Sequence, residues 1–138
     1  MNKKALTLIN NMALFRKQYH NFLNERVANL EITSSEFSYL KQLVNNDGAL
    51  QDIIVKNTCI DKAATTRIAQ SLEKKDIIKR VRNEKDKRNF NVYLTEKGKA
   101  YIKIINGILE DWYLTLSKEV DKETLLLFEE VLDKLTHN

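Results

Sequence analysis

The stretch V-R-N-E-K-D-K-R-N-F-N-V-Y-L-T-E-K-G, residues 81–98, begins with a run of charges and continues with alternating apolar and polar side chains. Six of the seven residues in 82–88 are charged, and residues 90–95 then alternate between apolar and polar side chains. A period of two residues is typical of a half-buried strand. A second strand is expected over residues 77–82, so the stretch predicts a β-hairpin with a basic tip.

Two short helices are expected just before this hairpin, the first over residues 50–56 and the second beginning after Asp61, which can cap it. Two short helices joined by a tight turn form a helix-turn-helix. One side of the second helix carries Ala64, Ile68 and Leu72. The other side is small or polar and carries Lys62, Ala63, Thr66 and Gln70. This outer face suits the major groove of DNA, although an ordinary surface helix remains an alternative.

A helix-turn-helix followed directly by a hairpin is a winged helix. In this arrangement the strands hold the basic tip beside the second helix. Residues 62–103 carry thirteen Lys and Arg against five Asp and Glu, whereas the whole chain has a net charge of only +4. Clustered cations gain affinity for phosphates, although a solvated charged face is the alternative. Arg88 can enter the minor groove beside the recognition helix, and Asp86 can orient its guanidinium.

The composition predicts one mainly helical domain over residues 1–138. The chain has no proline, three glycines and one cysteine, so long helices meet few interruptions and no disulfide framework exists. No leader or apolar run of membrane length is visible, which predicts a cytoplasmic protein. We expect no cofactor, no metal site and no enzymatic activity, because no nucleophile with a base, paired carboxylates or phosphate-binding glycine loop stands out.

Amphipathic helices are expected on both sides of the winged helix. Residues 1–30 and 96–138 carry apolar residues at helical spacing, and Thr33 with Glu36 forms a capping box at the start of the intervening lobe, residues 33–95. The terminal stripes are more apolar than one small domain obviously needs. They are expected to cover a partner subunit, with an intramolecular core as the competing interpretation.

With these features the sequence resembles the multiple antibiotic resistance regulators, the MarR family of bacteria and archaea. The resemblance rests on D-K-A-A-T-T-R at 61–67, L-E-K-K at 72–75, D-K-R at 86–88 and L-T-E-K-G at 94–98. It implies a homodimeric winged-helix transcription regulator with about six helices and a two-stranded wing, dimerised through its terminal helices. It also implies release from operator DNA by a small ligand or oxidant.

The predicted function is therefore that of a sequence-specific, ligand-responsive repressor that binds a palindromic operator in double-stranded DNA. The alternative is a winged-helix interaction module or antirepressor without an operator of its own. The predicted recognition-helix contacts are Lys62, Ala63, Thr65, Thr66, Arg67 and Gln70. The predicted wing contacts are Arg82, Lys85, Asp86, Lys87 and Arg88. The possible pocket for a small-molecule effector is Phe15, Tyr19, Tyr39, Trp112 and Tyr113, although aromatics at this spacing also suit a simple core.

Two positions depart from the family pattern. Asp76 stands where the family usually has a glycine between the recognition helix and the wing, so this turn is expected to differ. Cys59 stands where a glycine is common in the turn before the recognition helix. A left-handed conformation there would cost about 1 kcal/mol, so we expect the turn either to be strained or to have relaxed.

Overall fold

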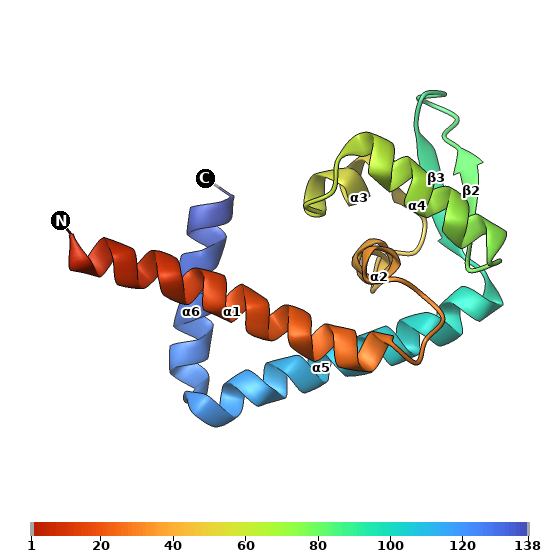
Figure 1. Cartoon of the computed structure of the whole chain (residues 1–138). Coiled ribbons are helices and arrows are strands. Elements are labelled where there is room, and N and C mark those ends of the chain that lie inside the picture. The colour runs from red at the N-terminus through yellow and green to blue at the C-terminus, as the bar shows by residue number, and fades with distance from the viewer. Residues whose placement is uncertain (1, 138) are drawn as a thin grey trace. The chain divides into compact units, whose positions relative to one another are not determined.

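The computed structural model describes residues 2–137 of the chain. Across these residues it contains six α-helices, one 3-10 helix and three short strands (Figure 1). In chain order the elements are α1 (Lys3–Val27), α2 (Ser34–Leu40), η1 (Lys41–Leu43), β1 (Ala49–Leu50), α3 (Gln51–Asn57), α4 (Lys62–Lys74), β2 (Ile78–Arg82), β3 (Phe90–Leu94), α5 (Glu96–Glu119) and α6 (Lys122–Thr136). The expected mainly helical fold with a β wing is confirmed.

The chain forms two compact units, Met1–Asn106 and Gly107–Asn138, and α5 crosses the boundary between them. The first unit holds every element from α1 to β3 and the start of α5. The second unit holds the remainder of α5 and all of α6. None of the helices in residues 2–137 is long and apolar enough to cross a membrane. The assignment of residues 33–95 to a DNA-binding lobe and of the flanking helices to dimerisation stays a prediction.

The wing belongs to a three-stranded antiparallel sheet with strand order β1-β3-β2. β2 pairs with β3 from Ile78 opposite Leu94 to Arg82 opposite Phe90. The short strand β1 was not expected, because two residues carry no periodicity that a sequence pattern could reveal. Gly48, with a left-handed φ of 87°, brings β1 to the sheet, and its amide donates to a carbonyl of β3 at 2.8 Å.

Polar side chains cap the start of three helices, and the caps at Thr33 and Asp61 were predicted from the sequence. Thr33 Oγ1 accepts from the Glu36 amide at 3.0 Å, and Glu36 Oε1 accepts from the Thr33 amide at 2.9 Å, which completes the capping box of α2. Asp61 Oδ1 caps α4 at 2.8 Å, and Thr95 Oγ1 caps α5 at 3.0 Å. These bonds satisfy amides that have no partner within their own helix, and they fix where each helix begins.

The core of the first unit is formed mostly by α2, α4 and the sheet. Phe37, Leu40, Ile54, Leu72 and Val92 have no exposed surface. In Figure 1, α2, α3 and α4 gather beside the sheet. Because these elements bury apolar surface on one another, the helix-turn-helix is anchored to the root of the wing.

Most of the apolar stripe of α1 lies outside this core. Of its described residues, only Leu23 and Val27 at the carboxyl end are buried. Leu6, Ile9 and Met12 are each more than half exposed. In α6 only Leu125 is buried among the described residues, and its remaining large apolar side chains are exposed. Each unit therefore leaves the apolar stripe of its own terminal helix largely uncovered.

The two turns that depart from the family pattern behave differently. Asp76 adopts a left-handed φ of 59°, so the turn into the wing keeps the conformation that a glycine would favour, contrary to expectation. Cys59 is not among the described non-glycine residues with positive φ, and its side chain is exposed, so the turn before α4 has relaxed. Strain is therefore stored at Asp76 and not at Cys59.

Replacing Asp76 with glycine should raise the free energy of unfolding by about 0.5–1 kcal/mol, because glycine adopts the left-handed region without steric cost. Urea titration followed by circular dichroism measures the change. Asp76→Ala is the matched control, since it removes the carboxylate but keeps the Cβ atom, and it should give no gain. An equal gain from both variants would trace the effect to the charge and not to the backbone.

Candidate nucleic-acid interface

The outer face of α4 is open to solvent. Four of the predicted contact residues on it are exposed: Lys62, Ala63, Arg67 and Gln70. Thr66 lies half-buried beside them and donates its hydroxyl to the Lys62 carbonyl at 3.0 Å. This face combines two cations, a carboxamide and a small side chain that permits close approach. Such a set can bind phosphates and read base edges in a major groove.

The inner face of α4 is rotated by one residue from the prediction. Thr65, Ala69 and Leu72 are buried, whereas Ala64 and Ile68 are only half-buried. Thr65 has no exposed surface, and its hydroxyl donates to the Asp61 carbonyl at 2.8 Å. The expected contact of Thr65 with DNA is therefore corrected, because its side chain is buried and stabilises the first turn of α4. Sequence spacing alone did not separate the two faces to within one residue.

The wing tip presents Lys85, Lys87 and Arg88 to solvent, as predicted. The Arg88 Nε atom lies 3.8 Å from Asp86 Oδ1, and both side chains are largely exposed. The same carboxylate oxygen accepts a hydrogen bond from the Arg88 backbone amide at 3.1 Å. Asp86 therefore orients the backbone at Arg88 directly, and it attracts the guanidinium only at longer range.

Asparagines that the sequence did not single out hold the wing in shape. Asn83 Oδ1 accepts from the amides of Lys85 and Asp86, each at 2.9 Å. Asn83 Nδ2 donates to Asn91 Oδ1 at 2.8 Å, and Asn91 Nδ2 donates to the Gly48 carbonyl at 2.9 Å. The bonds from Asn83 to the amides that follow it form an Asx-turn, which an asparagine at the start of a charged loop can signal. The basic tip is thus tied through β3 to the start of β1.

Two arginines brace the wing, Arg80 toward α3 and α4 and Arg82 at the loop. Arg80 donates through Nε to Glu73 on α4 at 2.8 Å, and through a terminal nitrogen to Gln51 on α3 at 3.3 Å. Its guanidinium also lies 4.8 Å from the centre of the Phe90 ring. Arg82, which was predicted to contact DNA, donates to the Lys87 carbonyl and lies over the same aromatic ring, 4.9 Å from its centre. Arg82 thus braces the wing loop while remaining exposed.

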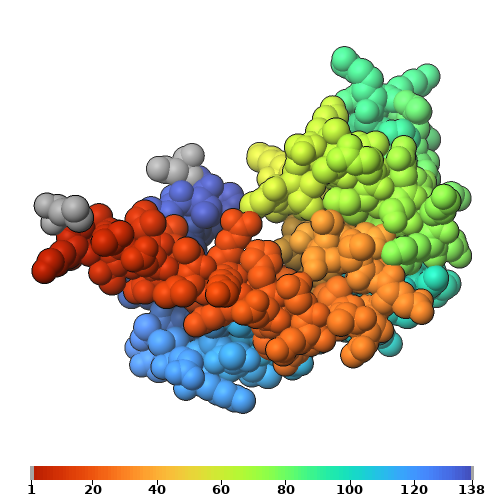
Figure 2. All heavy atoms as spheres, in the orientation of Figure 1, coloured from red at the N-terminus to blue at the C-terminus, as the bar shows by residue number. Residues whose placement is uncertain are grey.

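The tip and the outer face of α4 belong to the same unit, and Figure 2 shows the tip projecting from it beyond the helix. Cations of residues 62–103 therefore lie both on a protruding loop and on an exposed helix face, and these belong to neighbouring elements of the chain. This arrangement can present positive charge to a polyanion at two places at once.

The five aromatics of the predicted effector pocket are divided between the two units. In the first, Tyr39 is fully buried and donates its hydroxyl to Gln51 at 3.4 Å, and burial raises its pKa far above the ordinary range. Tyr39 is therefore a core residue in this structure. Tyr19 accepts a hydrogen bond from the Lys41 ammonium at 3.4 Å, and Phe15 is exposed. Trp112 and Tyr113 lie in the second unit, so a pocket that joins all five stays a prediction.

A helix-turn-helix made of α3 and α4, followed by the β2–β3 hairpin, defines a winged helix-turn-helix protein. Residues 32–90, which span α2 to the start of β3, match the model of the MarR family. The match covers 59 of the 138 residues, and over this part the chain is similar to the MarR family.

Relatives and solved structures agree with this assignment. The HTH-type transcriptional regulator SarZ of Staphylococcus aureus strain USA300 is 33% identical over 84 residues, which are 61% of this chain and 54% of SarZ. The chain thus matches about half the length of this curated relative. A MarR transcriptional regulator from Methanosarcina mazei Go1 superimposes with a TM-score of 0.80 at 27% identity, over 96% of both chains. The transcriptional regulator SlyA has the same fold, with a TM-score of 0.82 at 20% identity over 95% of this chain and 92% of its own.

Proposed function

We propose that this protein is a sequence-specific DNA-binding transcriptional regulator that acts as a homodimeric, ligand-responsive repressor on a palindromic operator. The single observation that carries the proposal is the pairing of an exposed basic face of α4 with a basic wing tip held by its own hydrogen-bond network. A solvated charged loop would need no such bracing. A cysteine-to-serine mutant of MarR from Escherichia coli, which has this fold with a TM-score of 0.79, was solved in complex with operator DNA.

The homodimer in this proposal rests on the exposed apolar residues of α1 and α6. A single α4 helix contacts too few base pairs for useful specificity in a genome, whereas a dimer presents two half-sites about one helical turn apart. A partner that covers the terminal helices would remove their apolar surface from water at the same time. The operator is then expected to be an imperfect palindrome.

Ligand response is the part of the proposal that rests on the family alone. Phe15, Tyr19, Trp112 and Tyr113 are the aromatics that stay predicted for an effector site, whereas Tyr39 is fully buried in the core of the first unit. A winged-helix antirepressor without an operator remains the second candidate. It is disfavoured because a module that binds only protein needs no cations on both α4 and the wing tip.

Gln70→Ala and Lys85→Ala test whether α4 reads sequence while the wing binds phosphate. Gln70→Ala should relax preference at individual base pairs by about 1–3 kcal/mol, because it removes a side chain that can pair with a base edge. Lys85→Ala should weaken all duplexes equally and reduce the slope of log affinity against log salt by about one. Fluorescence anisotropy over single-base variants of a selected duplex at two salt concentrations separates the two. Equal, sequence-independent losses from both variants would contradict the assignment.

Arg88→Ala should weaken binding of the selected duplex by about tenfold or more, because the wing loses its cation for the minor groove. Asp86→Ala should also weaken binding, although it removes a negative charge, since the Arg88 amide loses its acceptor. Glu84→Ala is the matched control, because it removes an exposed carboxylate from the same loop. Tighter binding by Asp86→Ala, in step with Glu84→Ala, would show that Asp86 only repels phosphate.

A further inference from the structure

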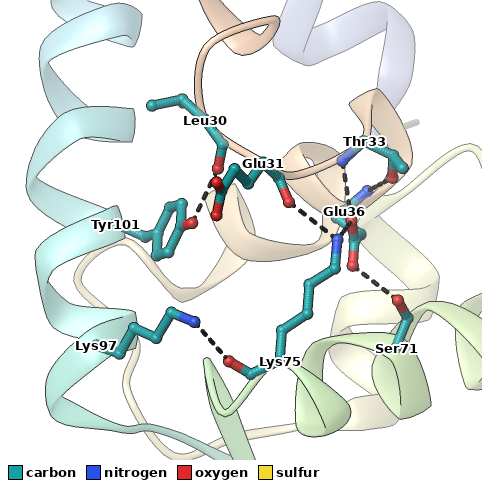
Figure 3. Close-up of polar contacts among 8 residues, drawn as sticks. All are labelled: Leu30, Glu31, Thr33, Glu36, Ser71, Lys75, Lys97 and Tyr101. Atoms are coloured by element: carbon teal, nitrogen blue, oxygen red, sulfur yellow. Dashed lines mark hydrogen bonds and ion pairs between the residues drawn. The ribbon is translucent and has the colours of Figure 1, made fainter.

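A polar cluster lies behind the recognition helix, on the side that faces α2 and α5 (Figure 3). We call it the clasp and define it as Glu36, Ser71, Lys75 and the backbone carbonyl of Glu31. Glu36 is 2% exposed, its Oε1 lies 2.7 Å from Lys75 Nζ, and its Oε2 accepts from the Ser71 hydroxyl at 3.0 Å. Lys75 Nζ also donates to the Glu31 carbonyl at 3.0 Å. One ammonium group thus joins the end of α4 to both α2 and the turn before it.

The acceptor atoms of the clasp are held in place by contacts that do not involve Lys75. The capping box of α2 binds Glu36 Oε1 to the Thr33 amide, so the carboxylate cannot swing away without uncapping the helix. Glu31 has a left-handed φ of 57°, which turns the chain between α1 and α2. Its carbonyl points at the Lys75 ammonium in Figure 3. The clasp is therefore a pre-formed receptor for a side chain at the carboxyl end of α4.

Two further bonds extend the clasp to α5. Lys97 Nζ donates to the Lys75 carbonyl at 2.9 Å, and the Tyr101 hydroxyl donates to the Leu30 carbonyl at 2.9 Å (Figure 3). Lys75 is the C-cap residue of α4, so Lys97 supplies a donor to a carbonyl at the end of that helix. The end of α4, the turn before α2 and the start of α5 are thus joined through polar groups.

The clasp is expected to add little to the net stability of the folded chain. Burial raises the pKa of Glu36, but the Lys75 ammonium, the Thr33 amide and the Ser71 hydroxyl outweigh it and hold that pKa below its ordinary value. A buried ion pair often contributes little net stability, because desolvation offsets the attraction, and an apolar replacement of both partners can be neutral. What the clasp supplies in any case is direction, since each of its hydrogen bonds has a preferred geometry.

We propose that Lys75 is a positioning residue for DNA recognition, which fixes the angle of α4 to α2 and α5 through Glu36 and the Glu31 carbonyl. The inference rests on the DNA-binding function proposed above. Reading base edges requires side chains held within about 0.5 Å of their productive place. When α4 pivots, only a fraction of molecules is competent for sequence recognition, and the apparent affinity falls by that fraction. Binding to phosphates does not depend on sequence, so its affinity should not change when α4 pivots.

The test is the double variant Glu36→Gln/Lys75→Met. The new carboxamide still completes the capping box, and the new thioether side chain keeps an apolar stem without leaving a buried carboxylate unpaired. We expect a melting temperature close to that of the parent and about tenfold weaker binding to a duplex enriched by the parent from a random library. Binding to a scrambled duplex should stay unchanged. Lys74→Met is the matched control, because it removes one exposed cation from the same turn and should not change the ratio of the two affinities.

A DNA-free measurement separates failure of the clasp from failure of the proposed function. The chain has one cysteine, Cys59, which is exposed in the turn before α4, so a nitroxide there follows the helix. With a second nitroxide at Lys99→Cys on α5 and an excess of unlabelled protein, electron spin resonance gives the distance within one chain. The double variant should broaden that distance distribution. Lys75→Arg, which keeps the cation, should give a distribution nearly as narrow as that of the parent and should keep most of the specific affinity.

An unchanged distance distribution in the double variant would overturn the inference, whatever the affinities. A broader distribution with unchanged specific affinity would overturn it as well, because α4 would then move without effect on recognition. If the parent enriches no duplex from the library, the proposed function itself fails, and the clasp loses its role with it. Should the double variant not fold, Lys75→Met alone carries the same tests, since it removes the ammonium while Thr33 and Ser71 still donate to the Glu36 carboxylate.

Discussion

Gly98→Ala should lower the free energy of unfolding by about 3 kcal/mol, the largest stability change expected from a single methyl group in this chain. A Cβ atom at Gly98 would lie 2.1 Å from the Ile77 carbonyl oxygen. That oxygen cannot retreat freely, because it accepts from both the amide and the hydroxyl of Thr95, at 3.1 and 3.0 Å. The substitution therefore forces the start of α5 away from the turn between α4 and β2. Urea unfolding followed by circular dichroism measures the loss.

Gly107→Ala is the control for this prediction and should have the opposite sign. Gly107 also lies within α5, but apart from its chain neighbours and the backbone of its own helix no atom lies within 4 Å of the place that its Cβ would occupy. Alanine in a helix interior is favoured over glycine by about 0.5–1 kcal/mol, so stability should rise. A Gly98→Ala protein as stable as the parent would show that α5 does not approach the α4–β2 turn so closely.

The second large effect is expected on assembly, from Leu132→Glu/Leu135→Glu in α6. Both side chains are already exposed in the single chain, at 41% and 71%, so a carboxylate should cost the folded chain little. In the proposed dimer the same substitutions would place four charges in an apolar contact, which should weaken dimerisation at least about 100-fold. Sedimentation equilibrium at micromolar concentration should find dimeric parent and monomeric variant. Specific DNA binding should fall with the dimer.

Lys122→Glu controls for charge in this experiment. It changes the net charge by the same two units, at an exposed polar position in the first turn of α6. A negative charge there is favourable at a helix N-terminus, and the dimer should persist. If the leucine variant unfolds while the parent is already monomeric, the apolar stripes belong to the core of one chain, and the proposed interface is wrong.

Local signals predicted most of the fold. The capping box at Thr33 and Glu36, the caps at Asp61 and Thr95, and the alternation of β3 each depend on residues close in sequence. For the same reason the order of helices and the wing followed from the chain alone. The two-residue strand β1 was missed, because pairing with β3 and not periodicity defines it.

The exposed charged residues of the candidate site were predicted from the sequence, but the hydrogen bonds that hold them in place were not. Lys62, Arg67 and Arg88 were expected from charge and from the family resemblance, and all three are exposed. The network of Asn83 and Asn91 joins residues eight apart across a hairpin, and the pair of Glu36 and Lys75 spans 39 positions. Such pairs leave no periodic trace in one sequence. Thr65 was misplaced because a shift of one residue on a helical wheel moves a side chain from the surface to the core.

Selection of duplexes from a random library by the purified parent, followed by sequencing, tests whether two copies of α4 and of the wing read DNA together. A dimer that reads DNA in this way should enrich an inverted repeat whose half-sites lie about 10 base pairs apart from centre to centre. Enrichment of an asymmetric site, or no enrichment over the starting library, would contradict it.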